Sequence, residues 1–322
     1  MNRARGALLA LALLWLATLL TAPLLGSQSI DLAQAFAGEA QAGTILWQLR
    51  VPRVLLGLLA GAILAGSGCA FQTLFRNPLA EPYTLGVSGG AALGAVAAIA
   101  LSGEGLGFPV ALASFLGALG AAALVLGFAG RRGAFDRHTL LLAGVALSLS
   151  SSALILFLQY LADPTETFRM VRWMMGGLSV AGYTEVVWLA PWAVGLAALL
   201  VAMRWPLNLL LTGEETAASR GVDVVRMRRL ILAGTSLAIG ALVAVAGPLG
   251  FVGLIVPHLM RRLVGHDHLR LVPAAMLGGG VFLALSDLAA RTVMAPAELP
   301  VGVLTALAGA PFFLWLLVGK GR

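Results

Sequence analysis

A series of long apolar stretches, separated by short polar connections, constrains this chain more than any other feature of its sequence. Bilayer hydrocarbon about 30 Å thick is crossed by roughly 20 helical residues. Only 11% of the 322 residues are charged, against about 25% in soluble domains, which excludes a water-soluble fold and a disordered chain. The sequence predicts an all-α polytopic membrane protein of about ten transmembrane helices, a single domain over residues 1–322. Nine spans are expected at 7–25, 51–75, 84–101, 108–129, 138–161, 184–203, 229–247, 271–290 and 301–318, with a shorter tenth at 250–264.

The basic residues predict how these spans are oriented. With ten crossings both termini lie on one side, and 16 of the 21 Lys and Arg residues then fall on that side. Cytoplasmic loops carry the excess of Lys and Arg, so we expect both termini in the cytoplasm and the net charge of +7 to mark orientation, not nucleic-acid binding. Arg3 and Arg5 before the first span also fit a signal peptide, but no A-x-A site follows, which favours a retained helix. The outer side keeps Arg50, Arg53, Arg169, Arg172 and Arg291.

Small residues recur at four-residue spacing, a pattern that lets helix backbones approach closely in lipid. One stripe is formed by Gly57, Gly61 and Ala65, and we expect it to serve helix packing, as does a second stripe of Gly86, Gly90 and Gly94. Gly- and Pro-interrupted stretches at 77–90 and 247–258 point to a transporter built from repeated halves.

Most signatures of catalysis or metal binding are absent from the sequence. No G-x-x-x-x-G-K-[ST] loop occurs, so the chain does not hydrolyse a nucleotide in that manner, and there is no H-E-x-x-H. His266 and His268 without a third ligand make a poor metal site, and we expect both in a solvated loop. Cys69 lies in an apolar run and is expected to be an inert packed thiol. The sequence therefore predicts no catalytic residue, no metal and no cofactor bound by this chain.

Two other functional classes have some support in the sequence. Gly86–Gly90 satisfies G-x-S-x-G, as in an intramembrane serine protease of the rhomboid type, but Ser88 would need His138 or His258 as its base. An ion-coupled secondary transporter would need buried ionisable residues, and Asp287 is the one candidate. Arg291 lies four residues after it, so an i,i+4 ion pair is expected to neutralise both.

Two polar segments could serve transport. Ser148, Ser151, Ser152 and Gln159 fall on one face of the span at 138–161, where they would line a substrate path or form interhelical hydrogen bonds. The connection 204–228 is the longest on the cytoplasmic side, and residues 212–221 predict a short helix closed by Gly221 in a left-handed conformation. Such a helix is either ordinary loop structure or a contact site for another protein.

Several motifs, in order along the chain, resemble the FecCD-type permeases, the membrane subunits of ABC importers for iron-siderophores, haem and cobalamin. The resemblance covers roughly residues 44–318. The motifs are Arg50-Val51-Pro52-Arg53, Gly61-Ala62, Ser67-Gly68, Gln72, Arg76-Asn77-Pro78-Leu79-Ala80-Glu81-Pro82, Leu85-Gly86, Trp173-Met174-Met175-Gly176-Gly177-Leu178, Gly247-Pro248-Leu249-Gly250-Phe251-Val252-Gly253-Leu254-Ile255-Val256-Pro257-His258, Glu298-Leu299-Pro300-Val301-Gly302-Val303 and Gly309-Ala310-Pro311-Phe312-Phe313.

The resemblance implies a type II ABC importer permease fold and a set of partners. A second copy or a paralogue would form a dimer, two ATPase subunits using ATP would bind the cytoplasmic face, and a periplasmic or lipid-anchored binding protein would deliver substrate. It also implies a multi-pass protein of the bacterial inner membrane, in contact with lipid. The loop 204–228 would be the coupling loop, with Arg220 departing from the family pattern. Its coupling residues would be Glu214, Glu215, Ala217, Ser219 and Gly221, and the outward docking residues Arg50, Arg53 and Arg291.

Transport would then proceed by ATP-driven alternating access, with the polar face of 138–161 lining the path. An iron-siderophore chelate is the main predicted substrate, with cobalamin or haem as alternatives.

Overall fold

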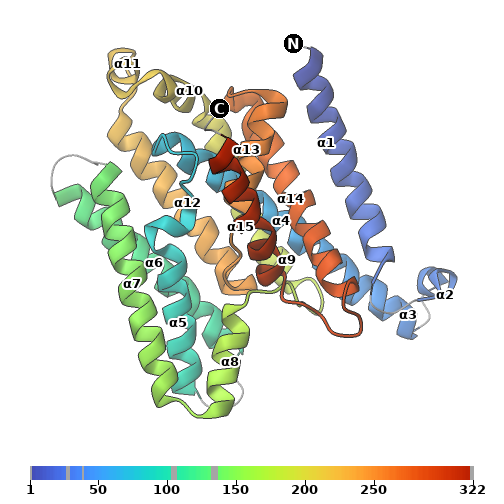
Figure 1. Ribbon diagram of the computed structural model, residues 1–322. Helices are drawn as coiled ribbons and strands as arrows, with labels where there is room; N and C mark the ends of the chain where they lie inside the picture. The colour runs from blue at the N-terminus through green and yellow to red at the C-terminus, as the bar shows by residue number, and fades with distance from the viewer. Residues whose placement is uncertain (1, 27–29, 38–39, 103–106, 132–136, 320–322) are drawn as a thin grey trace.

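The computed structural model describes residues 2–26, 30–37, 40–102, 107–131 and 137–319, and these residues fold into helices joined by short connections (Figure 1). The elements are α1 (Asn2–Thr21), η1 (Ala22–Leu24), α2 (Leu32–Ala37), α3 (Ala40–Thr44), η2 (Ile45–Arg50), α4 (Val51–Leu74), η3 (Pro82–Leu85), α5 (Val87–Ser102), α6 (Gly107–Arg131), α7 (Arg137–Leu161), α8 (Pro164–Met174), α9 (Thr184–Ala202), α10 (Arg204–Thr212), α11 (Glu214–Ser219), α12 (Val224–Ala246), α13 (Val252–Val264), α14 (His268–Thr292) and α15 (Val301–Gly319).

Each of the ten predicted spans contains a helix. Within the described residues, seven helical segments are long and apolar enough to cross a membrane. α5 and the described part of α15 are apolar but shorter, and α13 has 13 residues. The all-helical membrane fold is confirmed, and the count of ten crossings stays a prediction.

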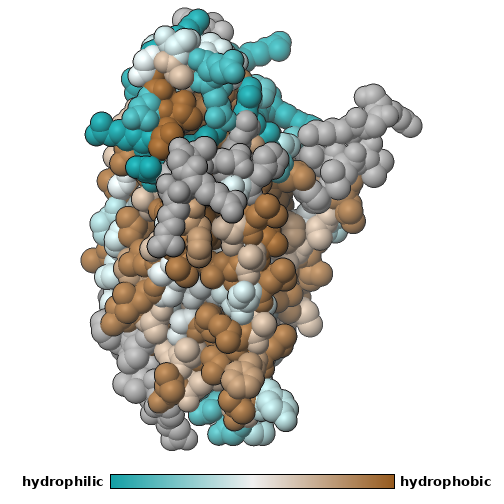
Figure 2. Space-filling model, turned by 90° about the vertical axis from the view of Figure 1, so that its left-hand side faces the viewer, coloured by the Kyte–Doolittle hydropathy of each residue, from teal (hydrophilic) through white to brown (hydrophobic). Residues whose placement is uncertain are grey.

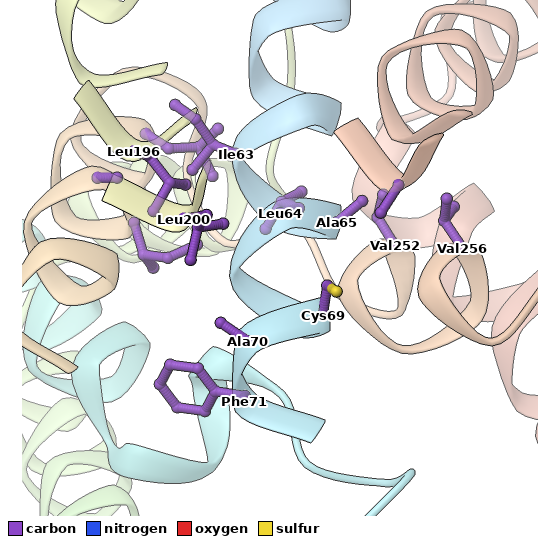
Figure 3. Close-up of a cluster of buried hydrophobic side chains, with 14 of the residues drawn as sticks. Ile63, Leu64, Ala65, Cys69, Ala70, Phe71, Leu196, Leu200, Val252 and Val256 are labelled. Atoms are coloured by element: carbon purple, nitrogen blue, oxygen red, sulfur yellow. The ribbon is translucent and has the colours of Figure 1, made fainter. Parts of the chain in front are cut away.

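The buried centre of the molecule is α4. Its apolar stretch is 83% buried, against 22% for those of α1, α7 and α9. Figure 3 shows how α4 fills the core: Ile63 lies beside Leu196 and Leu200 of α9, while Ala65 and Cys69 face Val252 and Val256 of α13. Cys69 is fully buried, which confirms that it is a packed thiol.

Glycines permit the tight crossings of α4. A Cβ added at Gly61 would overlap the backbone of Gly279 in α14, and one added at Gly68 would overlap Gly253 in α13. The predicted packing role of the glycine stripe is therefore confirmed at Gly61. Small residues allow this approach because helices in lipid associate by backbone packing and not by hydrophobic burial.

The helices give the molecule two polar ends. The "α11 end" holds α10, α11, the start of α1 and the last turns of α15; the "α8 end" holds α8, η2 and residues 293–300 (Figure 1). Figure 2 shows hydrophilic side chains gathered at the α11 end, above a broad hydrophobic belt. Of the sixteen basic residues predicted for one side, Arg132, Lys320 and Arg322 lie outside the described residues.

Four α-helices of the described residues were not predicted from the sequence, namely α2, α3, α8 and α10. Residues 164–174 form α8 and residues 204–212 form α10, where the sequence analysis placed connections. α8 begins with a recognisable cap, because the Asp163 carboxylate accepts a 2.8 Å hydrogen bond from the Glu166 backbone N–H and Pro164 occupies the first turn.

Candidate functional site

The predicted short helix of the loop 204–228 is present as α11. Gly213 (φ +132°) separates it from α10, and Gly221 (φ +84°) follows it in the predicted left-handed conformation. Among the predicted coupling residues Ala217 is fully buried, whereas Glu215, Ser219 and Gly221 are exposed. α11 therefore presents a small polar surface at the tip of the molecule (Figure 1).

An ion pair holds α11 against α12. The Arg228 guanidinium donates to the Glu214 carboxylate at 2.5 Å, and Arg228 is buried. Glu214, whose side chain is half-buried, is thus directed towards α12. Of the five predicted coupling residues, Glu214 and Ala217 position the helix, and the other three are available to a partner.

The base of α10 is joined to α14 and α4 by a polar junction. The side-chain oxygen Oδ1 of Asn208 lies 2.6 Å from His268 Nδ1 and accepts a 2.9 Å hydrogen bond from the His268 backbone N–H. His268 Nε2 lies 2.9 Å from the Thr73 hydroxyl of α4. The Asn208 amide donates to Asp267 at 2.8 Å, and this bond holds the pKa of the Asp267 carboxyl below its ordinary value.

The junction corrects the prediction for His268. The residue is 1% exposed and begins α14, so it is not in a solvated loop. His266, by contrast, is exposed as predicted. Burial of His268 is possible because Thr73 and Asn208 provide partners for both ring nitrogens.

Between α4 and α5 the chain makes a compact turn around η3. The Tyr83 hydroxyl accepts a 3.0 Å hydrogen bond from the Leu249 backbone N–H, and burial raises the pKa of Tyr83. Burial also raises the pKa of Glu81 to about 7, against the opposing effect of a hydrogen bond with the Phe251 backbone. Glu81 is therefore a carboxyl that titrates near neutrality.

The α8 end contains a charged cluster built on Asp287. Arg53 approaches this carboxylate with two nitrogens, Nε at 2.9 Å from Oδ2 and Nη2 at 2.9 Å from Oδ1. A third nitrogen of Arg53 donates to Glu298 at 2.8 Å. The side chain of Asp287 is 2% exposed and that of Glu298 43% exposed. The predicted pair with Arg291 is confirmed at 3.8 Å, but Arg53 is the closer partner of Asp287.

Arg50 and Arg291 belong to the same end and hold the N-terminal segment. Arg291 donates to the Ala22 carbonyl at 3.0 Å, and Arg50 donates to the Pro23 and Leu24 carbonyls at 3.5 and 3.4 Å. These residues are only 3% and 6% exposed. The three predicted docking arginines do lie at one end, but two of them are directed into the protein.

The polar stripe of α7 is divided between the interior and the surface. Ser151 is buried and Ser148 half-buried, both against Gly89 of α5. Ser152 is exposed on the outer side of the helix. Gln159 contacts α8, donating to the Met174 sulfur at 3.7 Å. Interhelical contact accounts for Ser151 and Gln159, so Ser152 is the residue most open to a path.

The geometry gives little support to a protease. Among the described residues Ser88 forms no hydrogen bond with a histidine, and the His138 side chain lies outside that part of the chain. The ring of His258 packs edge-on against Phe312 of α15, with centroids 6.4 Å apart. Asp287 is equally unsuited to binding a coupling ion, because two guanidinium groups already compensate its charge.

Comparison with known proteins places this geometry in a family. Residues 9–319 match the model of the FecCD transport family. The chain is 41% identical over 330 residues to the vitamin B12 import system permease protein BtuC of Klebsiella pneumoniae subsp. pneumoniae, covering 100% of this chain and 96% of the relative. It is 40% identical over 322 residues to BtuC of Escherichia coli O157:H7, covering 98% and 95%.

Solved structures agree with the fold. One, described as an inward-facing conformation of a metal-chelate type ABC transporter, has a TM-score of 0.87 and 33% identity and covers 98% of this chain and 99% of its own. A second, PsaBC from Streptococcus pneumoniae in complex with Fab, has a TM-score of 0.53 at 14% identity over 88% and 94%. The second likeness concerns the fold alone.

Proposed function

The chain belongs to the FecCD transport family, and from this premise we propose that it is the permease subunit of an ABC importer for cobalamin. The observation that carries the proposal is the identity of 40–41% over the full length to permeases named for vitamin B12 import. The sequence analysis gave an iron-siderophore as the main predicted substrate, with cobalamin or haem as alternatives. The relatives support cobalamin better.

The α11 end is the side that would contact two ATPase subunits, with ATP bound by them. α11 offers exposed Glu215 and Ser219 on a helix anchored by the Glu214–Arg228 pair. The polar junction at Asn208 would carry a displacement of α10 to α4 and α14, because its hydrogen bonds join all three helices. In this proposal the α11 end and both termini are cytoplasmic.

The α8 end would receive the substrate-binding protein. Arg53, paired with the exposed Glu298, is the arginine of the cluster nearest to the surface. An acidic group on the binding protein could replace Glu298 as its partner. Arg50 and Arg291 would contribute to docking indirectly, because their hydrogen bonds hold η1 in place. Charged contacts of this kind mainly set the rate and register of association.

A dimer of two such chains would enclose the path along α7. Cysteine labelling tests this assignment, because Cys69 is fully buried and contributes little background. We expect Ser152→Cys to react with a water-soluble maleimide in the assembled importer, and the buried Ser151→Cys to react at least about tenfold more slowly, since burial excludes the reagent. Equal labelling rates at the two positions would contradict the assignment of α7 to the lining of the path.

Assembly and growth test the proposed function as a whole. The chain should copurify with an ATPase subunit in equal number, and the importer should restore cobalamin-dependent growth to a bacterium that lacks its own corrinoid permease. A chain that carries Gln for Glu215 and Ala for Ser219 should fold but retain less ATPase. Restoration of growth on a ferric siderophore and not on cobalamin would contradict the proposal and favour the iron-siderophore as substrate.

A further inference from the structure

A concave pocket at the α11 end is lined by basic side chains. It has a volume of about 450 Å³ and lies between the end of α4, the turn that follows it, α10 and α13. Three arginines and two histidines line it, together with Gln72, Thr73, Pro78 and Leu211, and none of the described residues that line it carries a carboxylate. The basic residues are Arg76, Arg261, Arg262, His258 and His266.

Two of these arginines keep most of their donors available. A guanidinium has five N–H donors. Among the described residues, Arg76 donates to the Leu211 carbonyl at 3.3 Å, and Arg261 donates to the Gln72 side chain. Neither forms an ion pair with any described carboxylate. Asp267, which follows the arginines closely in sequence, is directed to Asn208 and to the first turn of α14.

The environment of Arg261 makes this arrangement costly unless an anion is bound. The residue is half-buried, and Gln72, its hydrogen-bond partner, is a neutral side chain that is itself 4% exposed. A guanidinium withdrawn from water without a counter-charge is destabilising. An anion in the pocket would restore the lost charge balance.

The backbone of Arg76 is a second sign that the pocket serves a purpose. Its φ of +48° is in the left-handed region, which favours Gly or Asn over a residue with a long side chain. Strain of this kind persists where the surrounding structure fixes it, and it is frequent at ligand sites. Here the strained residue is one of those that line the pocket.

We propose that this pocket binds a phosphate group. Planar guanidinium groups bind phosphate in a bidentate manner, and three of them carry more positive charge than a single carboxylate would compensate. Pro78 and Leu211 add an apolar wall that suits an esterified phosphate. The phosphate can come from an anionic lipid headgroup at the membrane surface or from free phosphate in solution.

The first experiment measures binding to the full-length permease in an uncharged detergent. Thermal unfolding is followed by tryptophan fluorescence during titration with inorganic phosphate, with sodium chloride at matched ionic strength as reference. We expect a saturable rise of the midpoint with phosphate, since a ligand that binds the folded state stabilises it. An equal effect of chloride, or no effect of either salt, would overturn the proposal.

Matched variants test the location. Arg76→Asn, which suits the left-handed backbone, is combined with Arg262→Gln, and the control combines Arg204→Gln with Arg226→Gln, two exposed arginines of the same end that do not line the pocket. We expect the pocket variant to weaken phosphate binding at least about tenfold and the control to leave it unchanged. Equal weakening in both would overturn the proposal. Arg262→Gln alone, on an exposed residue, provides a milder variant if the double variant does not fold.

Nanodiscs distinguish the two sources. The pocket would be assigned to a lipid headgroup if the permease were more stable in phosphatidylglycerol than in phosphatidylcholine and the pocket variant lost this difference. In that case inorganic phosphate should no longer stabilise the permease in phosphatidylglycerol. A phosphate effect that persists in both membranes would assign it to free phosphate. Either result supports the site, whereas a preference for phosphatidylglycerol that the pocket variant retains, with no phosphate effect, would refute it.

Discussion

Two groups of arginines, one at each end of the molecule, differ in how their positive charge is compensated. At the α8 end Arg53 and Arg291 share the buried Asp287, and Arg50 is held by backbone carbonyls of η1. At the α11 end the polar junction of Asn208, His268 and Thr73 uses neutral groups, while Arg76 and Arg261 form no ion pair within the described residues. These three arginines of the α8 end therefore have partners within the chain, whereas Arg76 and Arg261 of the α11 end carry positive charge that no described carboxylate compensates.

The largest expected effect comes from breaking the balance at the α8 end. Asp287→Asn would leave Arg53 and Arg291 without their common carboxylate, and removal of one partner from a buried pair costs about 3–5 kcal/mol of unfolding free energy. Glu298→Gln is the matched control, because Glu298 is 43% exposed and exposed pairs contribute about 1 kcal/mol or less. Unfolding of the two purified variants measures the difference, and equal losses would contradict the internal balance.

The α11 end should respond less strongly to a single substitution. His268→Leu would remove hydrogen bonds to Thr73 and Asn208 and leave their polar atoms without these partners, at a cost of about 1–3 kcal/mol. His266→Leu, on an exposed residue two positions earlier, should change stability little. Unfolding midpoints measured for both variants check the expectation. If the two substitutions had the same effect, the junction would not stabilise the base of α10.

A smaller, pH-dependent effect is expected from Glu81. Burial raises its pKa from 4.5 to about 7, so the folded protein favours the protonated form. The stability that this group contributes is fully present below about pH 4.5 and is lost as the pH rises through 7. Glu81→Gln should therefore flatten the decrease in stability between pH 5 and 8. An unchanged pH profile would show that Glu81 is ionised in the folded protein at pH 5.

The control for Glu81 is Glu215→Gln, because Glu215 is exposed on α11. Its substitution should leave the pH profile of unfolding as it is in the unmodified chain. Comparison of the two profiles distinguishes the titration of the buried Glu81 carboxyl from a general effect of removing one negative charge. A flatter profile in both variants would assign the effect to net charge.

Features with local causes were predictable from the sequence. Apolar stretches of spanning length located the helices, and Gly221 marked the end of α11. α8 was missed although its signal was present, since Asp163, Pro164 and Glu166 form a helix cap. Hydropathy does not distinguish α8 from a connection, because this helix is short and polar on one side.

Features that depend on distant partners could not be predicted. The burial of His268 depends on Asn208, sixty residues earlier, and on Thr73. The side chains of Arg50 and Arg291 are directed into the protein because they donate to carbonyl groups of η1. The predicted topology places both residues on the outer side of the membrane but does not reveal these partners. The resemblance identified the three arginines as a group, and only the structure shows how they are held.

Uptake by the reconstituted importer tests the central claim most directly. Proteoliposomes that contain this permease, its ATPase and its binding protein would be loaded with ATP and supplied with labelled cobalamin, ferric siderophore or haem. The account predicts ATP-dependent accumulation of cobalamin that exceeds that of the other two substrates and disappears when ATP is replaced by ADP. Accumulation of a different substrate in preference to cobalamin, or uptake without ATP, would contradict it.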